Sequence, residues 1–220
     1  MESMINLTIL ALVSLLNIFQ TSWLEAIAVC FGILSVWYAK KANVLVYPTG
    51  IISVLIYVYI CHEHQLYADM GINLFYFAIS IYGWHKWTRK SITGDNLPIS
   101  WNTPKQQISG ILLSAIFFVA IFGLIYVFKK TDTHYIESYV PYIDSFTTAI
   151  FLTAMLLMAK KRVENWIYWT IGNIVSIPLY FSKGLYFTSF QFAVFLALSI
   201  AGYFAWKRMY LNESNSTKKS

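Results

Sequence analysis

One stretch of the chain carries aromatic and polar side chains at intervals that suit a binding surface. Residues 163–182 read VENWIYWTIGNIVSIPLYFS, and the side chains concerned are Trp166, Trp169, Asn173, Ser176 and Tyr180. Their spacings of three and four residues return to one face of an α-helix. Indoles stack on flat rings and attract cations, at about 0.5–2 kcal/mol per contact, while amides and hydroxyls recognise donors and acceptors. The pattern therefore predicts a site for a flat, cationic ring that carries hydroxyl groups.

This stretch is also long and apolar enough to cross a bilayer. An unpaired amide in hydrocarbon costs several kcal/mol, so a lipid-facing helix would gain nothing from Asn173. We therefore expect this face to line a cavity inside the protein. Tryptophan near the end of a span also serves as an interfacial belt residue, and a membrane asparagine also joins helices. Those two roles stay open for Trp166 and Asn173.

Two further stretches supply the rest of the predicted site. Residues 66–87 read LYADMGINLFYFAISIYGWHKW, in which Asn73, Tyr76 and Ser80 share a helical face. Residues 185–206 contribute Gln191 in their first half. We predict substrate contacts from Trp166, Trp169, Asn173, Ser176, Tyr180, Asn73, Tyr76 and Gln191, with Ser53, Tyr57, Thr188 and Ser189 as further polar neighbours.

The chain has no pattern typical of a catalytic or metal site. The histidines fall in loops or at the ends of apolar runs, and the two cysteines, Cys30 and Cys61, have no CxxC spacing. Hydrolase, kinase and P-loop motifs are missing from the sequence. Asp69 and Glu164 lie near span ends, where we expect solvated or capping carboxylates. We predict no enzyme activity, no metal, no cofactor and no obligatory proton or sodium coupling.

The composition indicates a polytopic membrane protein. The chain is 58% apolar and 12% charged, with a mean hydropathy of +0.56, whereas soluble domains are about 25% charged. So few charges cannot coat a globule of 220 residues. The net charge of +6 does not indicate nucleic-acid binding, because the basic residues form short clusters between apolar runs.

The apolar runs predict seven membrane spans. They are residues 24–39, 43–61, 66–87, 107–128, 144–160, 163–182 and 185–206. Residues 5–20 would reach only about 24 Å as a helix, so we expect an interfacial or partly inserted helix there. The predicted organisation is an apolar helix in 1–22, a three-helix unit in 23–90, a linker and connecting helix in 91–128, a second unit in 129–207 and a cytoplasmic tail in 208–220. We expect residues 211–220 to be disordered.

The basic residues orient the predicted spans. Of the 16 lysines and arginines, 13 fall in the loops on one side of a seven-span chain, the side that also holds the C-terminus. The positive-inside rule places that side in the cytoplasm of a cell whose inner membrane holds the protein.

The chain also carries an internal repeat. The third and seventh spans match at an offset of 119 residues, with Gly83 on Gly202 and Trp87 on Trp206. The second and sixth spans match at an offset of 123, with Tyr57 on Tyr180. One span between the two units gives a parallel repeat of three, one and three helices, an architecture known among transporters such as the SWEET group.

Together, the run LYADMGINLFYFAISIYGWHKW, the ENWIYW stretch with Asn173 and Tyr180, and YPTGIISVLIYVY resemble the PnuC family of vitamin transporters. The resemblance covers about residues 24–207. It implies a SWEET-like fold, a homotrimer and facilitated diffusion, with a cytoplasmic vitamin kinase or pyrophosphokinase trapping the substrate by phosphorylation. It also implies that Trp166, Trp169 and Asn173 belong to the binding motif and that Asn73 and Tyr76 face them.

Members of this family divide by substrate into carriers of nicotinamide riboside, thiamine or riboflavin. Nicotinamide riboside carriers typically have glutamine where this chain has Asn73, and asparagine there resembles the thiamine (PnuT) branch. The sequence therefore predicts a thiamine importer, with nicotinamide riboside as the alternative and riboflavin less favoured. An integral-membrane enzyme or a receptor without transport is the alternative from another class.

Overall fold

The structure is a computed structural model that describes residues 23–89, 97–182, 184 and 186–217. The helix expected over residues 5–20 lies outside the described residues. Within them the chain is helical, and the longest extended segment is residues 97–103 before α4, which we call the linker. In chain order the helices are Trp23–Lys40, α2 (Val46–Glu63), α3 (Tyr67–Thr88), α4 (Pro104–Lys129), α5 (Thr133–Ile136), α6 (Val140–Ala159), α7 (Asn165–Ser182) and α8 (Tyr186–Thr217).

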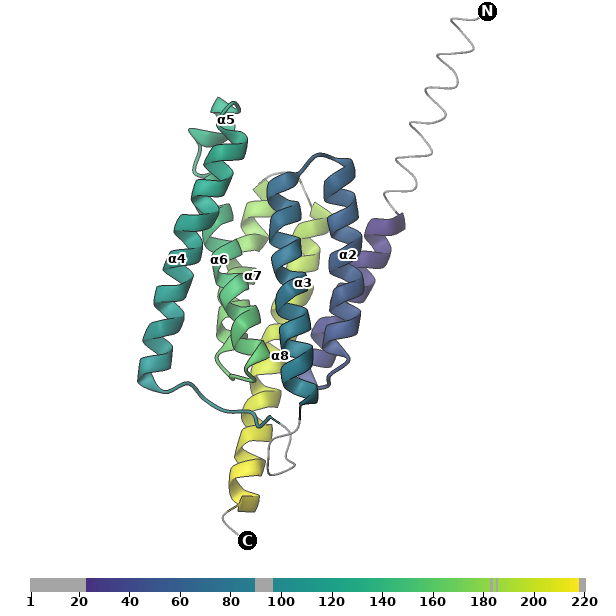
Figure 1. The fold of residues 1–220 in the computed structure, drawn as a ribbon, viewed down its shortest axis with the longest axis vertical. Helices are drawn as coiled ribbons and strands as arrows, with labels where there is room; N and C mark the ends of the chain where they lie inside the picture. The colour runs from purple at the N-terminus through teal and green to yellow at the C-terminus, as the bar shows by residue number, and fades with distance from the viewer. Residues whose placement is uncertain (1–22, 90–96, 183, 185, 218–220) are drawn as a thin grey trace, which may run out of the picture.

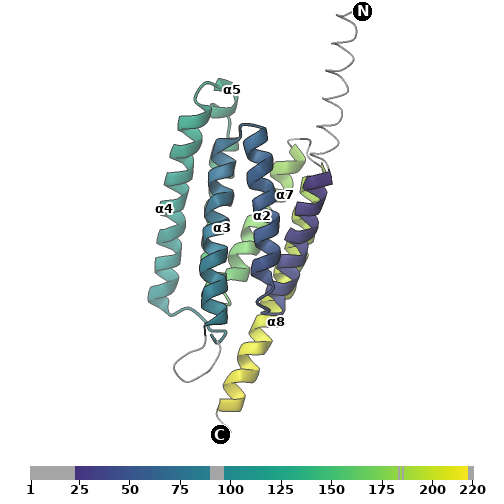
Figure 2. The same cartoon turned by 45° about the vertical axis from the view of Figure 1, so that its right-hand side comes forward.

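The long helices run side by side, and α4 stands at the edge of the bundle (Figure 1). We call the end that carries α5 the upper end and the end from which α8 projects the lower end. The helix Trp23–Lys40 runs beside α2, and a hydrogen bond from the Ser53 hydroxyl to the Ala28 carbonyl, 2.8 Å long, joins the two (Figure 2). α7 packs between α6 and α8, and α3 packs against both α2 and α6. This arrangement encloses a space between α2, α3, α6, α7 and α8.

Each predicted span corresponds to a helix, and two of the shifts at the helix starts have local causes. α4 begins at Pro104 rather than residue 107 because Thr103 forms a capping box: its hydroxyl accepts the Gln106 N–H, and the Gln106 side chain accepts the Thr103 N–H. α6 begins at Val140 rather than residue 144, with a proline in its first turn, where the missing N–H costs nothing.

The prediction of a disordered tail is wrong for residues 211–217. α8 continues to Thr217 as one helix of 32 residues. No proline or glycine follows Gly202 to end it. Tyr210, beyond the predicted end of the span, lies edge-on to the Trp101 ring with the centroids 6.4 Å apart. The extension is therefore packed against the linker that precedes α4.

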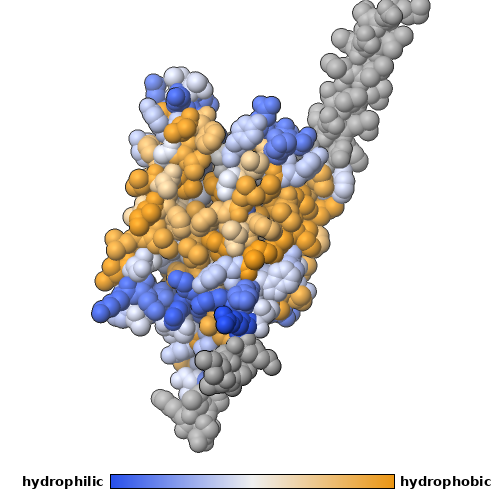
Figure 3. Space-filling model, viewed as in Figure 1, coloured by the Kyte–Doolittle hydropathy of each residue, from blue (hydrophilic) through white to orange (hydrophobic). Residues whose placement is uncertain are grey.

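Hydropathy separates two helices from the others. Five helices are long and apolar enough to cross a membrane: Trp23–Lys40, α2, α4, α6 and α8. α3 and α7 are not among them, and these are the two helices that carry most of the predicted site. On the face that Figure 3 shows, apolar residues form a belt across the middle of the molecule, and hydrophilic residues gather at its two ends. Polar side chains on α3 and α7 thus lie at the depth of an apolar belt.

Two turns at the lower end have the same hydrogen bonds at an offset of 119 residues. In the turn before α2, backbone N–H groups donate to backbone carbonyls in these pairs: Lys41 to Tyr38, Ala42 to Ala39, Asn43 to Tyr38, Val46 to Asn43 and Tyr47 to Val44. The turn before α7 has the same bonds 119 positions later: Lys160 to Leu157, Lys161 to Met158, Arg162 to Leu157, Asn165 to Arg162 and Trp166 to Val163. Ala42 and Lys161 both have a positive φ of 51°. The backbone before α2 and the backbone before α7 therefore have one conformation.

The side chains that follow these turns keep the same offset. Tyr47 lies over Gly83 and edge-on to Trp87, and Trp166 lies over Gly202 and edge-on to Trp206. The second and sixth predicted spans therefore correspond at 119 residues, and the offset of 123 is wrong by four. Four residues are about one helical turn, so both offsets place the same helix face inward, and residue types alone could not separate them.

Candidate functional site

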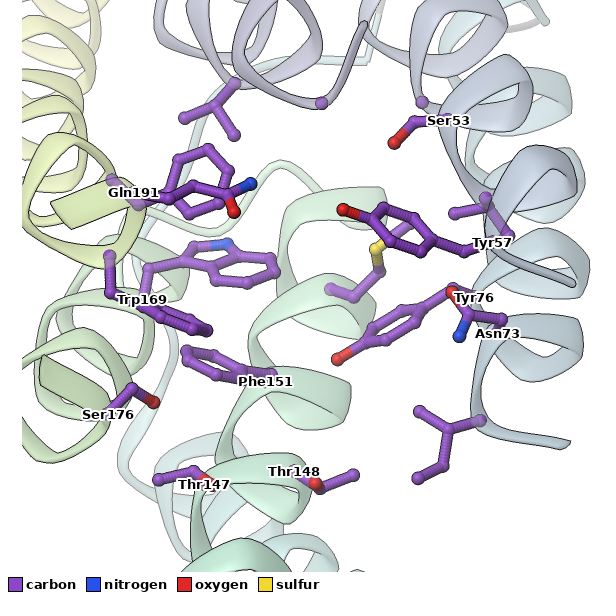
Figure 4. Close-up of a pocket in the computed structure, with 18 of the residues that line it drawn as sticks. Ser53, Tyr57, Asn73, Tyr76, Thr147, Thr148, Phe151, Trp169, Ser176 and Gln191 are labelled. Atoms are coloured by element: carbon purple, nitrogen blue, oxygen red, sulfur yellow. The ribbon is translucent and has the colours of Figure 1, made fainter. Parts of the chain in front are cut away.

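A cavity of about 610 Å³ lies inside the bundle. The helix Trp23–Lys40 and α2, α3, α6, α7 and α8 form most of its wall (Figure 4). Every residue predicted to contact a substrate lines this one cavity: Trp166, Trp169, Asn173, Ser176, Tyr180, Asn73, Tyr76 and Gln191. Residues more than 100 positions apart in the chain, such as Asn73 and Gln191, thus line the same cavity.

α7 turns its aromatic and polar stripe toward the cavity. Trp166 is 1% exposed and Asn173 is 2% exposed, whereas Ile174 on the opposite face is 53% exposed. The burial of Trp166 rules out the interfacial-belt role that the sequence left open. The stripe has the orientation that its spacing predicts, and its role in binding a substrate stays a prediction.

Four rings form a continuous aromatic column along the cavity wall. Trp169 stacks on Phe151 at a centroid distance of 5.3 Å, Phe151 on Phe192 at 6.0 Å, and Phe192 on Tyr180 at 5.0 Å. The planes of neighbouring rings differ by 27°, 7° and 15°. We call these four residues the aromatic column. It offers a flat guest more than one stacking position.

A glycine brings two helices of the column together. A Cβ added at Gly172 would fall inside contact distance of the Phe151 ring, so only glycine lets this ring lie flat against α7. Phe151 and Phe192 were not predicted as site residues, because a phenylalanine in an apolar helix looks the same whether it faces lipid or a cavity. The small residue at position 172 is the signal that could have identified Phe151.

Polar groups surround the column. The Asn73 amide nitrogen donates to the Asp69 carbonyl at 2.9 Å, which fixes the orientation of that side chain. Thr147 and Thr148 of α6 also line the cavity, although the sequence predicts no site residue on this helix (Figure 4). Of the further polar neighbours, Ser53, Tyr57 and Thr188 line the cavity. Ser189 does not: its hydroxyl donates to the Ile177 carbonyl at 2.9 Å.

Charged residues line the cavity near its upper end. They are Glu25, Asp69, Lys129 and Asp144. The Tyr135 hydroxyl donates to the Asp144 carboxylate at 2.7 Å, and the Lys129 ammonium lies 4.6 Å from the centre of the Tyr135 ring. Burial, the hydrogen bond to Asp144 and the negative charge of that residue raise the pKa of Tyr135 above its ordinary value, so the hydroxyl remains a donor. The middle and lower parts of the described wall are uncharged.

The linker before α4 is bound to the turn between α6 and α7. The Ser100 N–H donates to the Lys161 carbonyl at 3.1 Å, and the Val163 N–H donates to the Ser100 carbonyl at 3.0 Å. The Arg162 guanidinium donates to the Ser100 hydroxyl at 2.8 Å and to the Trp101 carbonyl at 3.0 Å. Through these hydrogen bonds the linker covers the lower end of the bundle. Lys161 in the same turn is itself buried, which lowers the pKa of its ammonium group, while the negative charge of Glu213 acts in the opposite direction.

Glu164 is part of this contact. Of the two roles expected for this carboxylate, solvated or capping, the solvated one is wrong. The residue is 5% exposed, and one carboxylate oxygen accepts the Asn102 N–H at 2.7 Å. The linker folds over the turn and removes the carboxylate from water. Asp69, by contrast, is exposed near the start of α3, as expected of a carboxylate at a span end.

Comparison with known proteins gives matches over nearly the whole chain. The PnuC nicotinamide riboside transporter of Escherichia coli K12 is 26% identical over 214 residues, which cover 89% of this chain and 88% of that protein. The riboflavin/roseoflavin transporter RibM of Streptomyces davaonensis is 23% identical and covers 84% of both chains. The crystal structure of a vitamin B3 transporter PnuC has the same fold, with a TM-score of 0.66 at 24% identity over 94% of this chain and 90% of that one.

The family comparison agrees with these matches. The model of the nicotinamide mononucleotide transporter family matches residues 22–208 of the 220. The chain therefore belongs to the nicotinamide mononucleotide transporter family, which confirms the PnuC resemblance and makes it a multi-pass membrane transporter rather than an enzyme.

Proposed function

We propose that this protein imports nicotinamide riboside across the cell inner membrane by facilitated diffusion. The observation that carries the proposal is the aromatic column beside Asn73, Asn173 and Gln191 in one cavity. A pyridinium ring suits a stacking surface, and its carboxamide and ribose hydroxyls suit side-chain amides. Relatives that cover most of this chain are named nicotinamide riboside transporters, which supports this substrate over thiamine.

The size and charge of the cavity favour a nucleoside over a nucleotide. A volume of about 610 Å³ lies within the range of small-molecule sites. Lys129 is the lysine that lines the described wall, and it lies near the upper end beside Tyr135. A phosphate in the middle of the cavity would have no cation to pair with. We therefore propose the riboside as substrate, although the family description names the mononucleotide.

Thiamine is the second candidate, and it is based on Asn73 alone. Thiamine also has a cationic heteroaromatic ring and a free hydroxyl, so the aromatic column by itself does not distinguish the two substrates. Riboflavin is less favoured because its ring is uncharged. Uptake of both compounds measured in the same liposomes therefore compares them directly.

We propose a parallel repeat of three, one and three spans as the architecture, with the units in residues 23–90 and 129–207. The repeated turn bonds and the contacts of Tyr47 and Trp166 with glycines support an ancestral duplication. We also propose that the lower end and the C-terminus face the cytoplasm, because the basic residues cluster there. A homotrimer and a cytoplasmic kinase as functional partner complete the proposal.

Uptake by purified protein in liposomes tests the substrate. Radiolabelled nicotinamide riboside should enter with saturable kinetics until the concentrations on the two sides are equal. Thiamine should enter more slowly, and nicotinamide mononucleotide should not enter. Thiamine uptake without riboside uptake would reverse the assignment, and binding without flux for either compound would indicate a receptor.

The same liposomes test the passive mechanism. An imposed proton or sodium gradient should not change the final riboside concentration inside. Enclosing a riboside kinase with ATP should raise total uptake above equilibrium, because phosphorylation removes the transported species. Accumulation driven by a gradient without the kinase would contradict facilitated diffusion.

A further inference from the structure

Four aromatic residues close the lower end of the cavity. They are Tyr47, Trp87, Trp166 and Trp206, each 5% exposed or less, and we call them the aromatic floor. The Tyr47 and Trp87 rings meet edge-on at 5.1 Å, and the Trp166 and Trp206 rings meet edge-on at 5.6 Å. The Trp87 and Trp206 rings lie 6.0 Å apart and join the two pairs. Tyr47 and Trp166 are the members that line the cavity itself.

Two members of the floor tie the halves of the molecule to each other. The Trp87 indole N–H on α3 donates to the carbonyl of Ala159 at the end of α6, at 3.2 Å. The Trp206 indole N–H on α8 donates to the carbonyl of Ala39 near the end of the first helix, at 2.9 Å. Each bond joins a helix of one unit to a helix of the other. The pair therefore holds the lower ends of the two units together.

The other two members of the floor have polar atoms without such bonds. The Tyr47 hydroxyl and the Trp166 indole nitrogen are buried, and neither has a hydrogen-bond partner among the described residues. The Ser80 hydroxyl, which also lines the cavity, is in the same condition. A buried polar group without a partner destabilises the conformation that buries it. The indole bonds of Trp87 and Trp206 therefore stabilise the closed floor. The unpartnered polar atoms of Tyr47 and Trp166 destabilise it.

The linker seals the floor from below. Ile99 and Val163 are buried in the same apolar cluster as the four rings, at 5% and 0% exposure. The hydrogen bonds of Ser100 to the backbone on both sides of Arg162 hold this segment in place. Among the described residues, these contacts cover the aromatic floor on the side away from the cavity.

From these contacts we infer that the aromatic floor is the lower gate of the carrier, locked by the two indole bonds and biased toward opening by Tyr47 and Trp166. When the units part, the two indole bonds break and the hydroxyl and the second indole gain water or substrate as partners. The inference rests on the proposed transport function. It predicts that two conservative substitutions in one ring cluster change access to the cavity from the lower side in opposite directions.

A cysteine above the floor reports its opening. We would place Ser80→Cys in a Cys30→Ala, Cys61→Ala background and apply a membrane-impermeant methanethiosulfonate from the lower side only. Trp206→Phe keeps a ring but removes the donor to Ala39, so labelling should accelerate roughly fivefold. Tyr47→Phe removes the unpartnered hydroxyl, stabilises the closed floor and should slow labelling by a similar factor. Trp87→Phe replaces Trp206→Phe if that variant fails to fold.

Trp84→Phe is the matched control, because Trp84 is on α3 with Trp87 but is 38% exposed. It should leave the labelling rate unchanged. Equal rates in the Trp206→Phe, Trp87→Phe and parent proteins, or acceleration by Tyr47→Phe, would overturn the gate. Labelling needs no substrate, so a failed gate and a failed transport assignment give separate results: the first shows in these rates and the second in riboside uptake.

Discussion

The two units of the molecule agree at their lower ends and differ where they line the cavity. Residues 119 positions apart share turn bonds and ring-on-glycine contacts below the cavity. At the same offset the cavity walls have different side chains: Gly32 corresponds to Phe151, Gly50 to Trp169, Val54 to Asn173, and Asn73 to Phe192. The backbone frame is therefore close to symmetric, while the surface that it presents is not.

This difference assigns the units different tasks. The second unit supplies the four stacked rings of the aromatic column. The first unit supplies Gly32, Gly50 and Val54 at the corresponding places, together with the Asn73 amide and the separate rings of Tyr57 and Tyr76. Even the contact between neighbouring helices is inverted. Gly32 lies against the Ser53 side chain in the first unit, whereas the Phe151 ring lies on Gly172 in the second. The continuous stacking surface therefore belongs to the second unit, and both units present polar groups to the cavity.

The largest expected effect tests the shared frame. Gly202→Ala places a methyl group 2.6 Å from atoms of the Trp166 ring, and Gly83→Ala does the same against Tyr47. Overpacking of this kind costs about 1–3 kcal/mol, so both variants should have a lower unfolding temperature in detergent. Gly123→Ala on α4 is the control, because nothing lies within 4 Å of its added methyl group. A lower unfolding temperature in only one of the two variants, Gly202→Ala or Gly83→Ala, would show that the two units do not share this packing contact.

The aromatic column gives the next effect, in binding. Trp169→Ala removes a ring that stacks on Phe151 and faces the cavity, so riboside affinity should weaken by about 1–3 kcal/mol in calorimetry. Trp84→Ala removes an indole from the exposed face of α3 and should leave affinity unchanged. Wild-type affinity in a folded Trp169→Ala protein would remove the column from the site.

The linker contact distinguishes the two repeated turns and should give a smaller effect. Arg162→Ala loses hydrogen bonds to Ser100 and Trp101, which should lower stability by about 1–2 kcal/mol. Asn43 occupies the corresponding place in the first turn, and the hydrogen bond that its side chain makes among the described residues is local, from the Leu45 N–H at 2.9 Å. Asn43→Ala should therefore cost less. Thermal unfolding of both variants checks the order, and a reversed order would show that the linker does not brace the second turn.

The smallest expected effect on stability concerns the upper end of the bundle. Two carboxylates there, Glu25 and Asp144, occupy corresponding positions of the two units, 119 residues apart. Tyr135→Phe removes the hydrogen bond to Asp144 and should cost about 0.5–1.5 kcal/mol of stability. The pKa of Tyr135 is raised, so the hydroxyl stays protonated. The difference in stability between Tyr135→Phe and the parent should accordingly be the same at about pH 6 and about pH 9. Both pH values lie above the ordinary pKa of a carboxyl group and below that of tyrosine. A difference that vanishes at the higher pH would mean that the hydroxyl ionises.

Much of the fold and the predicted wall could be read from the chain because both depend on local patterns. Apolar runs locate the long helices to within a few residues at most ends, and the spacing of Trp166, Trp169 and Asn173 indicates which face of α7 turns inward. Helical periodicity needs no knowledge of partners. It succeeds wherever one face of a helix is more polar than the other.

The failures arise where a second segment decides the outcome. Phe151 becomes a cavity residue only because Gly172 lets it lie against α7, and Glu164 is buried only because Asn102 folds over it. The repeat offset failed for another reason, since a shift of one turn preserves the helix face. The substrate assignment from Asn73 is not supported by the relatives, because one side chain among many in a cavity does not determine which ring fits.

α8 also makes the molecule convenient to observe. An unbroken helix of 32 residues is about 48 Å long. A tilt of roughly 5° about its upper end would carry the far tip through about 4 Å. A spin label near Thr217 would therefore convert small rotations of the helix within the bundle into displacements large enough for spectroscopy to measure.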